Sequence, residues 1–489
     1  MSEQPTARPT SLTTRTIRGV AWTLPTSLGS RVVGLVGTLL LARYLAPAEY
    51  GEVTEAAILA VTASGVTTFG VGLYLLSNRD LTRADVFHAT CWFVATGVVA
   101  LGAVWAVTWV ILPELRDYMP LFMLSVLLDR ISYLPERMLI RQLRFPWLSL
   151  ARAGGELAFT GTSLGLAVAG YGAMSIVYAF FARSALKFVA LVPAVSWREW
   201  AEPHRLRKDT LMKIIRFGTT ISVAGIATFL MRRWDNLLVQ AFFGNATMGA
   251  YNYAYNLADT PAVAIGEQMS DVVAASFPHA EGEKRRAAVV RACTMISLIM
   301  FPLAFGLGAV AETVVETFFD AKWASVGTML MLLSVLSAPR PMAHILNSYF
   351  LAGQRQRVIM VQEWLSLGIL MVGIATIGRL GIHWTCGVVG VAFILRTLML
   401  MWAAERLDGI PMRRFLVPLT RPLVACLAMV AAIEVARPAL SGLSPLIRLL
   451  AEISIGGAVY LAGALLIFRA AAAEFLGLIR GSLSRRSAD

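Results

Sequence analysis

Arginines inside long apolar runs are the residues of this 489-residue sequence best placed to do chemistry. A charged side chain at membrane depth costs about 2.5 to 3.5 kcal/mol on insertion scales, so it pairs with another group or lines a water-filled cavity. The planar arginine fork of N–H donors matches phosphate and carboxylate groups. We therefore predict that six arginines bind an anionic substrate group: Arg31, Arg232, Arg340, Arg130, Arg152 and Arg183.

Two of these arginines have informative surroundings. Arg31 lies near the middle of a predicted helix over residues 17–44, about 20 Å from either end, on a face of small and polar residues that suits a cavity wall. Arg340 stands between Pro339 and Pro341, which should break a helix at mid-membrane and free carbonyl groups that only a cavity or neighbouring helices could satisfy.

A structural role is the alternative for all of these arginines. They could pair with helix carbonyls, with Asp129 or with Glu156, and Arg152 lies four residues before Glu156 on the same predicted helix. Such pairs would hold a helix bundle together without binding a substrate.

Three acids in the second half of the chain are candidates for binding a coupling cation, either sodium or a proton: Asp235, Glu363 and Asp259. The structural alternative is a salt bridge to Arg232, Arg233 or Arg396. The intramembrane charges of the first half are mainly basic, whereas those of the second half are mixed. We therefore expect any cation site in the second half.

Fourteen apolar runs are long enough to supply the membrane-spanning helices that position these side chains. They cover residues 17–44, 50–77, 86–112, 118–140, 147–168, 172–195, 213–242, 248–277, 290–319, 323–352, 357–378, 383–405, 414–436 and 446–470. The predicted fold class is an all-α integral membrane protein.

The distribution of Lys and Arg predicts the orientation of these helices. With the N-terminus inside, the cytoplasmic segments hold 27 basic residues and the outside loops and helix ends hold six. Cytoplasmic loops carry such an excess, so both termini are predicted to be cytoplasmic.

An internal repeat divides the chain into halves. When residues 17–62 are aligned with residues 215–260, ten of the 46 positions are identical, Gly51 with Gly249 among them. Six helices separate the copies, so the halves should be parallel repeats, with Arg232 facing Arg31. The predicted organisation is a cytoplasmic disordered tail (1–16), an N-lobe (17–195), a cytoplasmic linker (196–212), a C-lobe (213–407), two appended helices (408–470) and a cytoplasmic tail (471–489).

The composition excludes several classes of protein. Hydrophobic residues make up 57% of the chain and charged residues 15%, against about 25% charged in an average soluble domain. The four cysteines and five histidines form no metal-ligand spacing, and no Gly-rich phosphate loop is present. We expect no resident cofactor, and we expect the net charge of +13 to face anionic lipid rather than nucleic acid.

Several segments resemble the polysaccharide transporter family of Wzx-type oligosaccharide flippases, within the multidrug/oligosaccharidyl-lipid/polysaccharide exporter superfamily. They are Leu39–Gly51, Phe242–Ala254, Phe277–Arg286, Trp323–Leu330 and Leu351–Arg355. The resemblance implies two six-helix lobes, and the lipid flippases often carry two further helices, which fits fourteen spans.

The resemblance also implies a function. The substrate would be a polyprenyl-diphosphate-linked oligosaccharide, moved by alternating access from the cytoplasmic to the outer leaflet of a bacterial inner membrane for surface polysaccharide assembly. Membrane lipids, a polysaccharide polymerase and its chain-length machinery would be partners. In the lipid II flippase branch, it implies a sodium site where Asp235 and Glu363 fall.

Other functions remain as alternatives. A cation-coupled drug antiporter of the same superfamily would have an apolar central cavity rather than one lined by arginine. A polymerase or ligase would need a large outside loop, whereas the predicted ones have about ten residues, so we expect no enzyme. Six aromatic residues near predicted interfaces should anchor the helices at the membrane surface: Tyr251, Tyr253, Tyr255, Trp105, Trp109 and Trp323.

Overall fold

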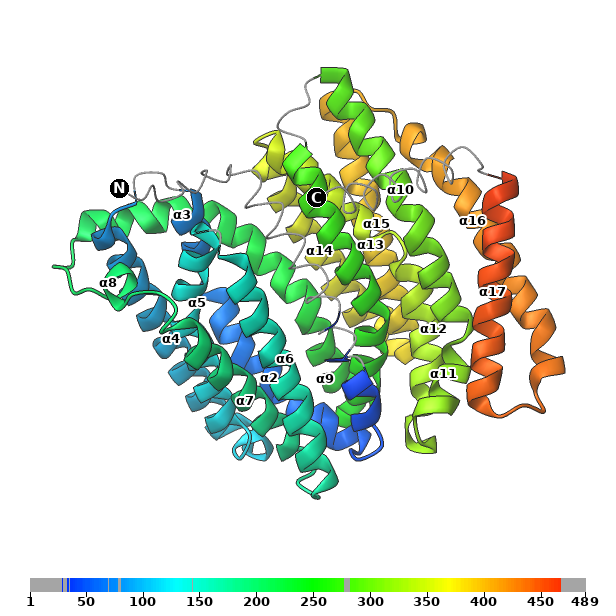
Figure 1. The fold of residues 1–489 in the computed structure, drawn as a ribbon, viewed down its shortest axis with the longest axis horizontal. Helices are drawn as coiled ribbons and strands as arrows, with labels where there is room; N and C mark the ends of the chain where they lie inside the picture. Colours follow the sequence, from blue (N-terminus) through cyan, green and yellow to red (C-terminus); the bar gives the residue numbers. More distant parts are fainter. Residues whose placement is uncertain are drawn as a thin grey trace, which may run out of the picture. The chain divides into compact units, whose positions relative to one another are not determined.

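The described part of the computed structural model is built from helices and their connecting turns and contains no strand (Figure 1). It comprises residues 29, 33–34, 36–68, 70–77, 81–142, 144–276 and 282–467. Eight of its helical segments are long and apolar enough to cross a membrane. The described residues form two compact units, one from residues up to 45 and from 52–226, the other from 46–51 and from 227 onward.

The first unit is a bundle whose tightest packing joins α5, α6 and α7. Its elements are α2 (Pro47–Val66, of which the first turn belongs to the second unit), α3 (Val71–Ser77), α4 (Arg83–Ile111), η1 (Pro113–Leu115), α5 (Met119–Arg141), α6 (Phe145–Val168), α7 (Met174–Leu191), α8 (Trp197–Trp200) and the first part of α9 (Lys208–Ser276). Thr82 and Asp85 cap the start of α4 reciprocally, which fixes where this helix begins.

The second unit contains the remainder of α9 and the helices that follow it. They are α10 (Gly282–Ala309), α11 (Ala311–Phe318), η3 (Ala321–Trp323), α12 (Ser325–Ser337), α13 (Arg340–Ala352), α14 (Gln356–Thr376), η4 (Gly378–Leu380), α15 (Ile382–Asp408), α16 (Met412–Leu440) and α17 (Pro445–Ile467). The helices α16 and α17 pack side by side, and α16 also packs on α10 (Figure 1).

The predicted spans from residue 50 onward coincide with these helices, and the all-α fold class is confirmed. Helix α9 covers two predicted spans, which Gly244 separates with its left-handed φ of 81°. Three predicted spans are each divided into two helices: α2 and α3, α10 and α11, and α12 and α13. The predicted span 17–44 lies mostly outside the described residues, as do the N-terminal and C-terminal tails.

The predicted break at the two prolines is confirmed. Helix α12 ends at Ser337 and α13 begins at Arg340. The hydroxyl of Thr397 on α15 donates a hydrogen bond of 3.2 Å to the carbonyl of Pro339. A neighbouring helix therefore satisfies a carbonyl group at the break, as buried backbone in a membrane requires.

The two copies of the internal repeat touch each other reciprocally within the second unit. A Cβ atom on Gly51 would lie 2.0 Å from the carbonyl oxygen of Asn245, and one on Gly249 would lie 2.1 Å from that of Pro47. The repeat alignment pairs Gly51 with Gly249 and Pro47 with Asn245. Gly51 thus meets Asn245, which the alignment pairs with Pro47, and Gly249 meets Pro47 itself. A local twofold axis that relates the two copies produces such a reciprocal contact.

Candidate functional site

A buried cluster of charged residues occupies the second unit, on α9, α13, α14 and α15. It brings together all three predicted cation-binding acids and two of the predicted arginines: Asp235, Asp259, Glu363, Arg232 and Arg340. The sequence left open whether these residues bind ligands or one another, and the partners of each acid differ.

Asp235 is fully buried and accepts hydrogen bonds from neutral donors. Tyr251 donates its hydroxyl to Oδ2 at 2.7 Å. The backbone N–H and side-chain amide of Asn236 donate to Oδ1 at 2.9 and 3.0 Å. Among the described residues, no cation lies within ion-pair distance of this carboxylate.

Asp259 and Glu363 both lie beside arginines. Asp259 Oδ1 is 2.8 Å from Arg340 Nη1. Arg396 donates to Glu363 Oε1, to which Asn347 also donates at 3.3 Å. Glu363 thus forms one of the salt bridges that the sequence offered as a structural alternative, the one to Arg396. Asp259 also forms a salt bridge, but with Arg340, which was not among the three arginines proposed as its partners.

Arg340 is held from several sides. Its guanidinium donates to the Tyr255 hydroxyl at 2.7 Å and lies 3.8 Å from the centre of the Phe393 ring. Its side chain is 6% exposed. A guanidinium enclosed by a carboxylate, a phenol and an aromatic face is fixed in orientation before any ligand arrives.

Arg232 is less constrained than Arg340. It is partly buried, and its Nη2 lies 3.5 Å from His344 Nε2 on α13. No carboxylate of the described residues lies within 4 Å of it. Within the described part of the chain, its positive charge is therefore not neutralised by a carboxylate partner.

Arg130, in the first unit, has all its donors occupied. It is 1% exposed, and its guanidinium donates to carbonyl and hydroxyl oxygens of Ser64, Thr67, Phe93 and Thr96 on α2, α4 and the turn after α2. It also stacks 4.0 Å from the Phe93 ring centre. Arg130 thereby ties α5 to α2 and α4, as the structural alternative required.

The remaining charges of the first unit form ion pairs across α5, α6 and α7. Arg152 pairs with Glu136, Arg183 with Glu156 at 3.7 Å, and Lys187 with Asp129 at 2.8 Å. Arg152 and Glu156 therefore do not neutralise each other.

These pairs are partly exposed, with Arg152 at 50% and Glu156 at 42%. Arg183 and Glu156 lie in the interior of their helices, where exposure to lipid would be costly, so we expect this face to border a solvated space. Arg31 lies outside the described residues.

The aromatic residues divide into two groups. Tyr251, Tyr253 and Trp323 are fully buried and Tyr255 is 5% exposed, so the prediction that they anchor the protein at the membrane surface is wrong. Tyr251 and Tyr255 instead form hydrogen bonds with Asp235 and Arg340, which hydropathy could not predict. Tyr253 and Trp323 pack against each other and against Tyr50.

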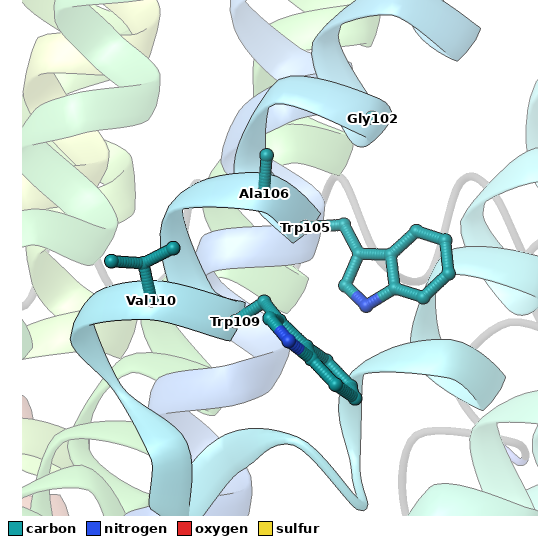
Figure 2. A pocket seen from close by; sticks show the side chains of 5 residues that line it. All are labelled: Gly102, Trp105, Ala106, Trp109 and Val110. Atoms are coloured by element: carbon teal, nitrogen blue, oxygen red, sulfur yellow. The ribbon is translucent and has the colours of Figure 1, made fainter.

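Two tryptophans do lie on the surface. Figure 2 shows Trp105 and Trp109 lining a shallow apolar pocket on α4. Both are about half exposed, and Arg116 stacks 4.9 Å from the Trp109 ring centre. This arrangement fits the predicted role of an anchor at the membrane surface.

Sequence reasoning missed several polar partners of the charged cluster, namely Asn236, Asn252, His344 and Asn347. The sequence signal that could have found two of them is an asparagine next to Asp235 and another 16 residues later, both inside apolar runs. Within the described ranges, no group of three or more His, Cys, Asp or Glu side chains could hold a metal ion.

Comparison with known proteins gives a family match. The model of a family described as polysaccharide biosynthesis protein matches residues 40–327. The succinoglycan biosynthesis transport protein ExoT of Rhizobium meliloti (strain 1021) is 23% identical over 490 residues, covering 96% of each chain. The lipopolysaccharide biosynthesis protein WzxC of Escherichia coli (strain K12) is 22% identical over 354 residues, covering 71% of each.

Solved structures share the fold. A lipid II flippase MurJ in an inward closed conformation superposes with a TM-score of 0.75 at 15% sequence identity, covering 91% of this chain and 98% of the other. An inward-facing multidrug resistance MATE family transporter of the MOP superfamily gives a TM-score of 0.55 at 16% identity, covering 83% and 97%.

Proposed function

We propose a function for this chain from the premise that it belongs to the polysaccharide biosynthesis protein family, whose model covers residues 40–327. It is a flippase that moves a polyprenyl-diphosphate-linked oligosaccharide from the cytoplasmic to the outer leaflet by alternating access. The chain is a multi-pass membrane protein. We place it in a bacterial inner membrane with both termini in the cytoplasm and with polysaccharide polymerase and chain-length machinery as partners.

The family membership is the observation that carries this proposal, and the named relatives support it. ExoT is named as a transport protein of succinoglycan biosynthesis and WzxC as a protein of lipopolysaccharide biosynthesis. A lipid-linked intermediate suits such a transport step, because its polyprenyl tail can stay in the hydrocarbon while a protein shields the polar glycan.

The arginines of the proposed site have different roles. Arg232 offers an unneutralised guanidinium in the second unit, and Arg340 lies in the same cluster, preorganised by its neighbours. Arg152 and Arg183 belong to partly exposed ion pairs in the first unit. Arg31 completes the proposed diphosphate-binding set, whereas Arg130 holds helices together.

Asp235 is the acid that we propose for the coupling cation, sodium or a proton. Asp259 and Glu363 lie against arginines, which satisfy their charge. The hydrogen-bond donors of Asp235 are neutral among the described residues, and the charge of Arg340, which acts on it from beyond ion-pair distance, is paired with Asp259. A cation would compensate a buried carboxylate of that kind. Asp259 and Glu363 then serve to hold Arg340 and Arg396.

Flipping in proteoliposomes tests the proposal. A fluorescent polyprenyl-diphosphate oligosaccharide should cross faster in vesicles that contain the protein than in empty ones. Arg232→Ala should slow this by roughly 10- to 100-fold at limiting substrate, because a charge-assisted hydrogen bond to the diphosphate is lost. Arg232→Lys should restore part of the rate.

The matched control is Arg379→Ala, which removes an exposed arginine of the same unit that stacks on Phe242. This variant should flip the substrate at the original rate. Transport of cationic drugs with no flipping of the diphosphate-linked glycan would instead identify an antiporter, and equal flipping by Arg232→Ala would remove this arginine from the binding site.

A further inference from the structure

A hydrogen-bonded chain of buried side chains leads from Asp235 to Tyr50. The Asn236 amide donates to Asp235 Oδ1 at 3.0 Å, and the Asn252 amide donates to Asn236 Oδ1 at 2.9 Å. The Tyr50 hydroxyl donates to Asn252 Oδ1 at 3.2 Å. Asn236 is 1% exposed and Asn252 is 4% exposed, so water has little access to the groups that form these bonds.

When Asp235 is ionised, its carboxylate fixes the direction of the bonds that follow from it. An ionised aspartate can only accept hydrogen bonds, so Asn236 must turn its NH₂ group toward Asp235. Its carbonyl oxygen then faces Asn252, whose own oxygen faces the Tyr50 hydroxyl. Charge at Asp235 strengthens the first bond, and cooperative polarisation extends this strengthening along the chain.

Tyr50 belongs to a short segment, Ala46–Gly51, that packs within the second unit although the chain on both sides of it belongs to the first unit. The centre of the Tyr50 ring lies 4.1 Å from the centre of the Tyr253 ring and 6.1 Å from that of the Trp323 ring. The backbone of the segment meets Asn245 and Gly249. The Tyr50 hydroxyl therefore adds a polar contact to these aromatic and backbone contacts.

We propose that the Asn236–Asn252–Tyr50 chain couples the charge of Asp235 to the docking of the segment Ala46–Gly51. When Asp235 is ionised, the chain is polarised toward it and the segment is held. When a proton or another cation neutralises Asp235, the bonds weaken and the segment is released more often. By linkage, release of the segment changes the affinity of Asp235 for its cation by the same factor.

This inference rests on the proposed function, because Asp235 is there the cation-binding acid. It adds three positioning residues, Asn236, Asn252 and Tyr50, which need not touch the substrate. It also lets cation binding at Asp235 affect a segment whose flanking residues on both sides belong to the other unit.

The test measures docking of the segment rather than transport. Ala46→Cys places a thiol at a partly buried position of the docked segment, and labelling by a membrane-impermeant maleimide in intact membranes measures its release; the protein without this substitution corrects for its four native cysteines. Asp235→Asn and Tyr50→Phe should each raise the labelling rate about five-fold, as loss of one buried hydrogen bond would. The ring of Phe preserves the contacts with Tyr253 and Trp323.

The double variant is decisive. If the chain couples the two ends, Asp235→Asn combined with Tyr50→Phe should label no faster than either single variant. The matched control is Asn256→Ala, which removes another donor to Asn252 Oδ1 at 2.7 Å but does not lie between Asp235 and Tyr50. In the Asn256→Ala background, Asp235→Asn should keep its five-fold effect.

Multiplicative effects of Asp235→Asn and Tyr50→Phe would overturn the coupling, as would an absence of labelling in every variant. Because labelling does not depend on flipping, the two proposals fail separately. A non-additive result in a protein that flips no glycan would preserve the coupling and remove the function. Cation-dependent flipping with multiplicative labelling would do the reverse.

Discussion

Residues of one type have different roles in this protein because their partners differ. Arg130 donates to oxygens of α2, α4 and the turn after α2, Arg396 is paired with Glu363, and Arg232 lacks a carboxylate within the described part of the chain. The sequence places all three inside long apolar runs. It could not distinguish them, because spacing along a helix predicts a face and not the neighbour that the face meets.

The Glu363–Arg396 pair leads to a prediction at this scale. Removing one partner of a buried ion pair leaves an uncompensated charge, at a cost of about 3 to 5 kcal/mol, whereas replacing both is often close to neutral. Glu363→Gln should therefore lower the melting temperature and membrane abundance, and Glu363→Gln with Arg396→Met should recover most of both.

Thermal unfolding in detergent, followed by size-exclusion chromatography, measures this effect. Asp235→Asn is the comparison, because it leaves no arginine unpaired among the described residues; it should change the melting temperature less than Glu363→Gln does. A double variant no more stable than Glu363→Gln alone would contradict the pairing as the source of the loss.

Helices and their breaks were the elements best predicted from the sequence. Apolar length and the segregation of basic residues are local properties, so the spans from residue 50 onward and the break before Arg340 could be predicted. The break at Gly244 within α9 falls between two predicted spans and could be predicted as well. The division of α10 from α11 could not, because hydropathy does not change there. The repeat was detectable, but the contact between its copies was not.

The reciprocal glycine contact predicts how two substitutions affect the packing of the helices that carry them. Gly51→Ala and Gly249→Ala should each destabilise the docking of the segment Ala46–Gly51 to a similar extent, because each added Cβ meets a backbone carbonyl at about 2 Å that cannot move aside cheaply. The measurement is maleimide labelling at Ala46→Cys, a partly buried position of the segment, which should rise in both variants.

Gly102→Ala on α4 is the control for the same substitution. A Cβ there meets no atom within 4 Å, and alanine favours a helix by about 1 kcal/mol over glycine. It should leave labelling unchanged and raise or preserve thermal stability. Labelling that rises with Gly249→Ala but not with Gly51→Ala would show that the two contacts are not equivalent.

At the scale of the whole molecule, the distribution of charge predicts the orientation in the membrane. Reporter fusions after Arg83 and Arg207 should read cytoplasmic, and fusions after Gly51 and Gly244 should read outside, because the basic residues concentrate in the segments predicted to face the cytoplasm. Paired alkaline phosphatase and fluorescent-protein fusions measure this. Reversed signals at any two sites would overturn the orientation.

The paired glycines also bear on how the two halves of the chain can evolve. In a dimer of two identical six-helix chains, a single glycine would make both contacts, and one mutation would damage the interface twice. Once two copies are joined in one polypeptide, each position can change alone. Here residues 47 and 245 already differ, as Pro and Asn, while both glycines remain. Contacts made through the backbone carbonyl tolerate a change of side chain at 47 and 245, whereas a side chain at either glycine would collide with a carbonyl oxygen.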